Sequence, residues 1–145
     1  MNIADIQFPV FKPYNKPAIE IYLSGCNRRC IDCHNEELWD FNFGKPLIIE
    51  DLIKYLKNKQ DWFECIGVTG GDLLCQNKTE AALLSAELRI AFVDKKMWLF
   101  TGENKFSAIP EWVMQIYDVI KHGSYIKELK IEGFPASSNQ KMWKK

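Results

Sequence analysis

Three cysteines within eight residues are the part of this sequence best suited to chemistry. Cys26, Cys30 and Cys33 stand in the segment CNRRCIDC, where one short loop can wrap their thiolates around a single metal cluster. A 4Fe-4S electron carrier normally has four cysteine ligands, and a structural zinc site also has four ligands. Three cysteines therefore favour a cluster with one open coordination position, where a small molecule can bind iron.

Two other interpretations of these cysteines remain open at this stage. One is a zinc or iron–sulfur module without catalysis, whose fourth ligand would come from elsewhere, and the other is a set of simple buried thiols. The candidates for a fourth ligand are His34, Cys65, Cys75 and His122. Cys65 lies in an apolar segment and is typical of a small buried side chain. Cys75 follows a Gly-Gly-Asp sequence by three residues and can approach the cysteine loop, so a redox or ligand role stays open.

Two glycine-containing segments also belong to the predicted site. Gly70 and Gly71 precede Asp72, and adjacent glycines let the backbone approach a ligand closely and adopt positive φ. Thr101 and Gly102 end another apolar segment. Each signal alone is also typical of an ordinary turn or strand end.

The surrounding sequence predicts strands and helices that alternate along the chain. The expected strands cover residues 18–24, 63–69 and 97–101, with weaker candidates at 118–121 and 126–131. The expected helices cover residues 49–59, 77–94 and 110–116. The cysteine loop, the glycine pair and the Thr-Gly pair each follow a predicted strand. Because carboxyl ends of parallel strands share one edge of a sheet, we expect these three segments to meet there.

This alternation predicts an α/β protein with a mainly parallel sheet, built as a partial or open (β/α) barrel. A complete eight-unit barrel needs about 250 residues, and this chain has 145. No repeat, low-complexity segment or flexible linker divides it, so residues 1–145 are expected to form a single domain.

The composition of the chain argues against two classes of partner, nucleic acid and membrane lipid. Lys plus Arg and Asp plus Glu both number 19, so no net charge draws the protein to nucleic acid or to anionic lipid. No apolar run is long enough to span a bilayer, and the N-terminus has no signal-peptide pattern. Together with the odd number of cysteines, five, this predicts a cytoplasmic protein. The lysine-rich residues 141–145 are interpreted as a solvated tail.

The spacing of Cys26, Cys30 and Cys33 resembles the signature of the radical S-adenosylmethionine enzymes. The resemblance implies a 4Fe-4S cluster on these cysteines and S-adenosylmethionine as a second cofactor, cleaved to a 5′-deoxyadenosyl radical. Gly70, Gly71 and Asp72 resemble the family segment that contacts the methionyl amino group, and Thr101 resembles a Thr-Gly strand end of small members. The resemblance further implies backbone contacts from Asp32 and His34.

Within that family, residues 33–35, 38–40 and 44–47 resemble the activating enzymes of glycyl-radical proteins. The short length and residues 137–140 are similar to activases of the anaerobic ribonucleoside-triphosphate reductase. This implies an oxidoreductase that removes a hydrogen from a glycine of the reductase large subunit, with flavodoxin or ferredoxin as electron donor. The alternatives are an activase of another glycyl-radical enzyme and a radical enzyme acting on a small molecule.

Overall fold

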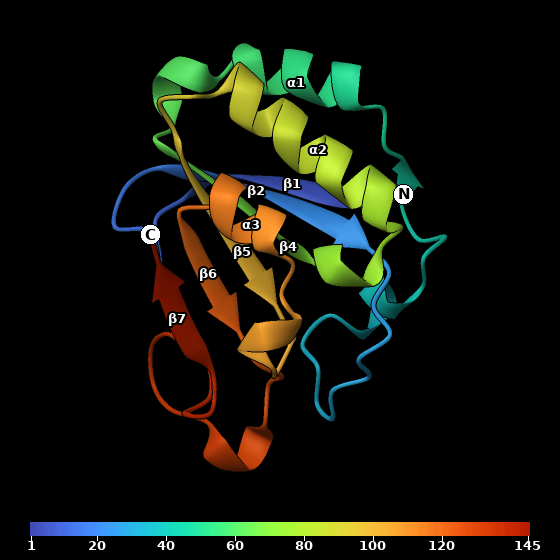
Figure 1. Ribbon diagram of the computed structural model, residues 1–145, viewed down its shortest axis with the longest axis vertical. Coiled ribbons are helices and arrows are strands. Elements are labelled where there is room, and N and C mark those ends of the chain that lie inside the picture. Colours follow the sequence, from blue (N-terminus) through green and yellow to red (C-terminus); the bar gives the residue numbers. More distant parts are fainter.

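The computed structural model describes all residues from 1 to 145, and its centre is a block of four parallel strands. These strands are β2 (Ala18–Ser24), β4 (Cys65–Gly70), β5 (Lys96–Thr101) and β6 (Val119–His122). They stand in that order in a seven-stranded sheet, and each is joined to the next by a crossover (Figure 1). The alternating pattern of the sequence therefore predicted the central strands correctly, with small differences at their ends.

Three antiparallel strands extend this block on both sides. They are β1 (Asn2–Val10) and β3 (Lys45–Pro46) next to β2, and β7 (Lys141–Lys144) next to β6. The sheet order β3-β1-β2-β4-β5-β6-β7 is open, because β3 and β7 are its two edges and do not pair with each other. The expected mixed α/β fold with an unclosed sheet is confirmed at this level.

Two sequence predictions about the C-terminal region are wrong. Residues 141–145 were expected to be a solvated tail, but Trp143 pairs with Ile120 in the β6–β7 ladder and packs against the core. The weak strand expected at 126–131 contains instead a 3-10 helix, η5 (Lys127–Leu129). Both segments are short and contain several lysines. The residue pattern of each segment therefore did not indicate which of them pairs with a neighbouring strand.

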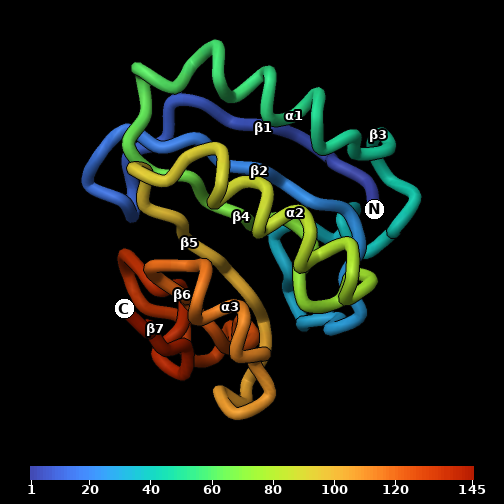
Figure 2. Tube along the Cα trace, turned by 45° about the horizontal axis from the view of Figure 1, so that its top comes forward, coloured from blue at the N-terminus to red at the C-terminus, as the bar shows by residue number.

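Three α-helices form a layer on one face of the sheet (Figure 1). They are α1 (Ile49–Lys57), α2 (Lys78–Ala91) and α3 (Glu111–Ile116). Short 3-10 helices connect the larger elements: η1 (Glu36–Trp39), η2 (Gln60–Trp62), η3 (Leu73–Cys75) and η4 (Phe106–Ala108). The side chain of Asn77 caps α2 by accepting a hydrogen bond from the Glu80 backbone at 3.1 Å, as the sequence predicted. In Figure 2, α1 and α2 run alongside β1, β2 and β4.

Successive side chains of a strand point to opposite faces of the sheet, so the buried side chains form two clusters, one on each face. Ile19, Ile21 and Leu23 of β2 belong to a core of 19 buried residues that also includes Leu84 and Leu88 of α2. The other face carries a smaller buried cluster of Tyr14, Ala18, Cys65, Trp98 and Val119. Helices thus cover one face of the sheet, and the strand ends are left to form sites. None of the helices combines the length and the apolar character that a membrane-spanning segment needs.

Candidate functional site

The carboxyl ends of the parallel strands surround a cavity of about 200 Å³. All three cysteines of the CNRRCIDC loop line it, together with Gly70, Gly71, Asp72 and Thr101. These residues end or follow β2, β4 and β5, which are neighbours in the sheet, so parallel pairing brings three separate sequence segments together at the carboxyl ends of the strands. The sequence analysis predicted for this reason that the three segments would meet, and in the structure all three line one cavity.

Gly25 begins the cysteine loop directly after β2. Its φ is +108°, and a Cβ atom at this position would lie 2.1 Å from the ring of Phe41. Its amide donates to the carbonyl of Leu38 at 2.8 Å, which fixes the start of the loop against η1. Within the loop, Arg29 and Asp32 also have positive φ, 52° and 59°. The backbone therefore turns sharply between successive cysteines, as a loop that wraps one cluster requires.

The glycine turn after β4 lies directly against the cysteine loop. The Asp72 amide donates to the carbonyl of Gly25 at 3.0 Å, and a Cβ atom on Gly71 would lie 2.4 Å from that same oxygen. Gln76 locks the two loops together, since its buried Nε2 lies 3.0 Å from the carbonyl oxygens of both Ser24 and Gly25. Sequence reasoning missed Gln76, because a glutamine after a turn has no distinctive pattern.

Asp72 is almost fully buried and accepts hydrogen bonds from several parts of the chain. The Thr101 hydroxyl lies 2.8 and 2.9 Å from its two oxygens, and the Gly102 amide donates at 2.8 Å. The Leu74 amide donates at 2.9 Å, and Arg28 Nε of the cysteine loop donates at 2.6 Å. The carboxylate therefore joins the loops after β2, β4 and β5. Its contacts with the protein indicate that Asp72 positions the site.

Arg28 also reaches Glu103, with Nη1 3.3 Å from the carboxylate. The pKa of Glu103 is lowered, mainly by the hydrogen bond from the Lys105 amide and also by the guanidinium of Arg28. Arg28 was not singled out from the sequence, although it lies between two of the cysteines.

Cys75 lies beside Cys26, as its position after the glycine turn allowed. The sulfurs of Cys26 and Cys75 and a carboxylate oxygen of Asp72 all lie within 4.8 Å of one another. The pKa of Cys26 is raised, first by its hydrogen bond with Cys75 and then by burial. The same hydrogen bond lowers the pKa of Cys75. Cys65, by contrast, is the first residue of β4, five residues before Gly70. It therefore lies at the amino ends of the parallel strands, away from the cysteine loop.

Aromatic side chains form part of the cavity wall. His34 packs on Tyr125 with ring centroids 4.9 Å apart, and Trp39 and Phe100 also line the cavity. Tyr125 was missed because it lies in a coil segment far along the chain. Lys121 lines the cavity as well; burial lowers its pKa, and the carboxylate of Asp72 partly offsets this.

Asp32 differs from the other predicted residues, because it is not among those that line the cavity. Its side chain is exposed, and its carboxylate lies 3.9 Å from the ammonium of Lys127. A side-chain contact between Asp32 and a molecule in the cavity is therefore not part of this arrangement, although its backbone lies within the cysteine loop.

The donor set fits an iron–sulfur cluster. Three thiols from one loop face a single cavity, and thiolates are the ligands that iron–sulfur clusters take in proteins. Cys75 is not among the residues that line this cavity, which leaves three cysteines facing it.

Residues 18–143 match the family described as a 4Fe-4S single cluster domain. The chain is also 32% identical over 130 residues to the anaerobic ribonucleoside-triphosphate reductase-activating protein of Enterobacteria phage T4, covering 86% of this chain and 82% of that protein. The chain belongs to this iron–sulfur family of activating proteins. The corresponding protein of Escherichia coli K12 is 29% identical over 128 residues, covering 83% of each chain.

A shorter similarity extends to a second class of activating enzyme. The pyruvate formate-lyase-activating enzyme of Clostridium pasteurianum is 35% identical over 60 residues, which are 39% of this chain and 25% of that enzyme. With the family match, these relatives confirm that the protein is an activase of glycyl-radical enzymes, of the oxidoreductase class. They also confirm the expectation of a 4Fe-4S cluster and S-adenosylmethionine as cofactors.

Proposed function

We propose that this activase generates a glycyl radical on the large subunit of an anaerobic ribonucleoside-triphosphate reductase, and that it does so as a radical S-adenosylmethionine enzyme. The observation that carries the proposal is the cavity where Cys26, Cys30 and Cys33 meet the glycine turn after β4. The similarity to reductase-activating proteins over most of the chain supports the choice of partner.

In this proposal the three cysteines hold the cluster through their thiolates. When bound, the cluster would supply the single electron that cleaves S-adenosylmethionine, and the glycine hydrogen would leave in 5′-deoxyadenosine. A flavodoxin or ferredoxin would provide that electron. The residues of the chain would then bind and orient the cosubstrate and exclude water from it.

The turn after β4 would receive the methionyl group. Gly70 has φ +100° and Gly71 has no room for a side chain, so the backbone itself lines the cavity here. Asp72 and Thr101 would hold that backbone in place through their hydrogen bonds. His34 and Tyr125 would offer aromatic surface to the adenosine, while Asp32 would contribute through its backbone alone.

We also propose that residues 1–145 act as one domain, a partial barrel of the radical S-adenosylmethionine type. The open sheet supports this, because strands β3 and β7 leave the sheet unclosed. A glycine-bearing loop of a partner protein could then reach the cavity from the open side.

Anaerobic reconstitution tests the proposal. Protein loaded with iron and sulfide should release 5′-deoxyadenosine and methionine when dithionite and S-adenosylmethionine are added, and the Cys30→Ser variant should release neither. Electron paramagnetic resonance of the reduced protein should change when S-adenosylmethionine is added. With the reductase large subunit present, a glycyl radical signal should appear on the reductase. Cluster-loaded protein that cleaves no S-adenosylmethionine would contradict the proposal.

Two alternatives have specific observations in their favour. The similarity to pyruvate formate-lyase-activating enzymes favours another glycyl-radical partner, and a radical signal on that enzyme instead of the reductase would identify it. The position of Cys75 beside Cys26 favours a metal site in which Cys75 supplies a fourth thiolate. Loss of the cluster in the Cys75→Ser variant would support that second alternative.

A further inference from the structure

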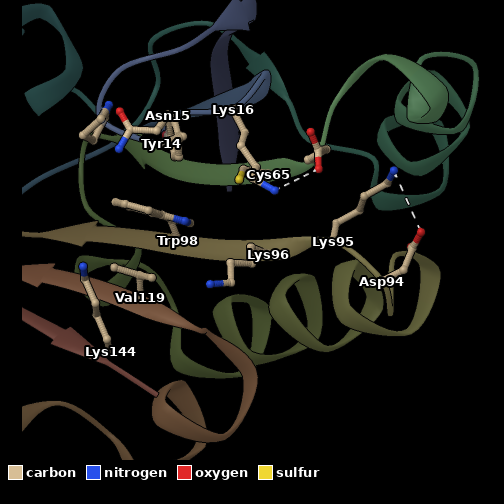
Figure 3. Close-up of a pocket in the computed structure, with 12 residues that line it drawn as sticks. Tyr14, Asn15, Lys16, Cys65, Asp94, Lys95, Lys96, Trp98, Val119 and Lys144 are labelled. Atoms are coloured by element: carbon tan, nitrogen blue, oxygen red, sulfur yellow. Dashed lines mark hydrogen bonds and ion pairs between the residues drawn. The ribbon is translucent and has the colours of Figure 1, made fainter.

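A second cavity lies at the opposite edge of the sheet, around the amino ends of the central strands (Figure 3). Its volume is about 510 Å³, and its walls come from the loop before β2, the first residues of β4, β5 and β6, and the end of β7. None of the three loop cysteines contributes to it. No residue lines both cavities, although they are neighbours: Trp98 of this cavity and Phe100 of the cluster cavity have ring centroids 6.1 Å apart.

Positive charge collects around this second cavity. Its charged lining residues are Lys16, Lys95, Lys96, Lys144, Glu64 and Asp94. Four lysines and two acids leave an excess of two positive charges, although the whole chain has a formal net charge of zero. Glu64 lies 3.3 Å from Lys16, and Asp94 lies 3.9 Å from Lys95. Lys96 and Lys144 form no ion pair with a carboxylate.

Trp98 adds a donor that the protein does not use. The Trp98 side chain is buried, with 8% of the residue exposed, and its Nε1 makes no hydrogen bond within the protein. Buried polar groups are nearly always paired, since an unpaired donor costs about 1–3 kcal/mol. In Figure 3, Lys16, Lys96 and Lys144 extend from three different segments around this indole ring. A ligand with acceptor oxygens would pair with the lysines, and it would pair with the indole N–H after a movement of the side chains that bury this nitrogen.

The pKa of the Cys65 thiol reflects the charges around this cavity. Burial and Glu64 raise its pKa, while Lys16 and Lys96 oppose that increase. Both ammonium groups therefore act on one point in the cavity wall, from the loop before β2 and from the start of β5. One part of the wall is apolar, with Tyr14 packed edge-on against Trp98 at a centroid distance of 4.9 Å and Val119 beside them, and Asn15 adds a polar side chain to the rest.

We propose that this cavity binds a small phosphorylated molecule of nucleotide size. Lysine ammonium groups and N–H donors are the protein groups that bind phosphate oxygens. A phosphate group would be the negatively charged partner that Lys96 and Lys144 do not have within the protein. The apolar wall would receive the uncharged part of the molecule. The volume falls in the range of about 300–1,000 Å³ that is typical of small-molecule sites. This site is separate from the activase cavity and does not depend on the proposed function.

Calorimetric titration of the full chain tests this inference, with adenosine triphosphate and inorganic tripolyphosphate as the two probes. The double variant Lys96→Gln/Lys144→Gln should bind adenosine triphosphate about tenfold more weakly or worse, because two charge-assisted contacts are lost. The matched control, Lys45→Gln/Lys54→Gln, removes the same charge from exposed lysines of β3 and α1 and should leave the affinity unchanged. Adenosine triphosphate should bind more tightly than tripolyphosphate if the apolar wall is used.

The donor of Trp98 has its own test. Trp98→Phe keeps an aromatic ring but removes the N–H, so it should weaken binding of both probes while circular dichroism shows a folded protein. Equal weakening in the two lysine double variants would overturn the proposal, since it would indicate attraction to charge in general. Binding of a glutamate-rich peptide without binding of either phosphate probe would also overturn it.

Discussion

The carboxylate of Asp72 accepts hydrogen bonds from the loops after β2 and β5 and from its own turn. It is 1% exposed, and Arg28, its charged partner, belongs to the cysteine loop. A buried carboxylate with this many donors is costly to remove, because each donor would be left without an acceptor. At the scale of the residue, Asp72 is therefore the side chain on which the relative position of the three loops depends.

Replacing Asp72 by alanine should lower the free energy of unfolding of the cluster-free protein by ~3–5 kcal/mol, as for other broken buried ion pairs. Urea denaturation measures this change. Glu103→Gln is the matched control, because Glu103 contacts the same arginine from a more exposed position, with 22% of its side chain exposed. The control should cost about 1 kcal/mol or less. Equal losses in the two variants would show that Asp72 does not hold the loops.

Cys75 provides a second test at the residue scale. We expect Cys75→Ser to retain its iron after anaerobic reconstitution, since Cys75 does not line the cavity that the other three cysteines share. Cys26→Ser, Cys30→Ser and Cys33→Ser should each lose the cluster. Iron and sulfide analysis with the visible absorption spectrum measures this. A Cys75→Ser protein without iron, beside a Cys33→Ser protein that keeps it, would assign the ligand to Cys75.

At the scale of the elements, the last strand forms one edge of the sheet. β7 pairs antiparallel with β6, and Trp143 packs against the main core while Lys141 stays exposed. Trp143→Ala should therefore lower the free energy of unfolding by roughly 2 kcal/mol, less than for a fully buried tryptophan. Lys141→Ala, on the same strand, should stay within about 0.5 kcal/mol of the natural protein. A Trp143→Ala protein as stable as the natural one would show that β7 does not support the sheet.

The elements also explain why the cluster site is assembled from separate loops. Parallel pairing of β2, β4 and β5 aligns their carboxyl ends, so each following loop starts from the same edge. Gln76 and the amide of Asp72 then join the first two loops through the carbonyl of Gly25.

At the scale of the whole molecule, the core and the cluster site are distinct. The 19-residue core contains no residue between Leu23 and Leu52, which excludes the entire cysteine loop. Removing the cluster with an oxidant and a chelator should therefore preserve the far-ultraviolet circular dichroism spectrum. It should lower the melting temperature, because a ligand that binds only the folded state stabilises it. Limited proteolysis should then cut between residues 26 and 35. Collapse of the circular dichroism spectrum would show that the fold needs its cluster.

The sequence by itself supplied the residues of the proposed site: three closely spaced cysteines after one apolar strand, and a glycine pair and a threonine at the ends of two others. Such patterns are local, so thiol chemistry and strand periodicity suffice to interpret them. Only the tertiary structure decided that β7 joins the sheet, that Asp32 stays outside the cavity, and that Gln76 and Tyr125 complete the site. It alone also placed lysines of distant segments around Trp98. Contacts between residues far apart in the chain depend on packing, which no short stretch of sequence encodes.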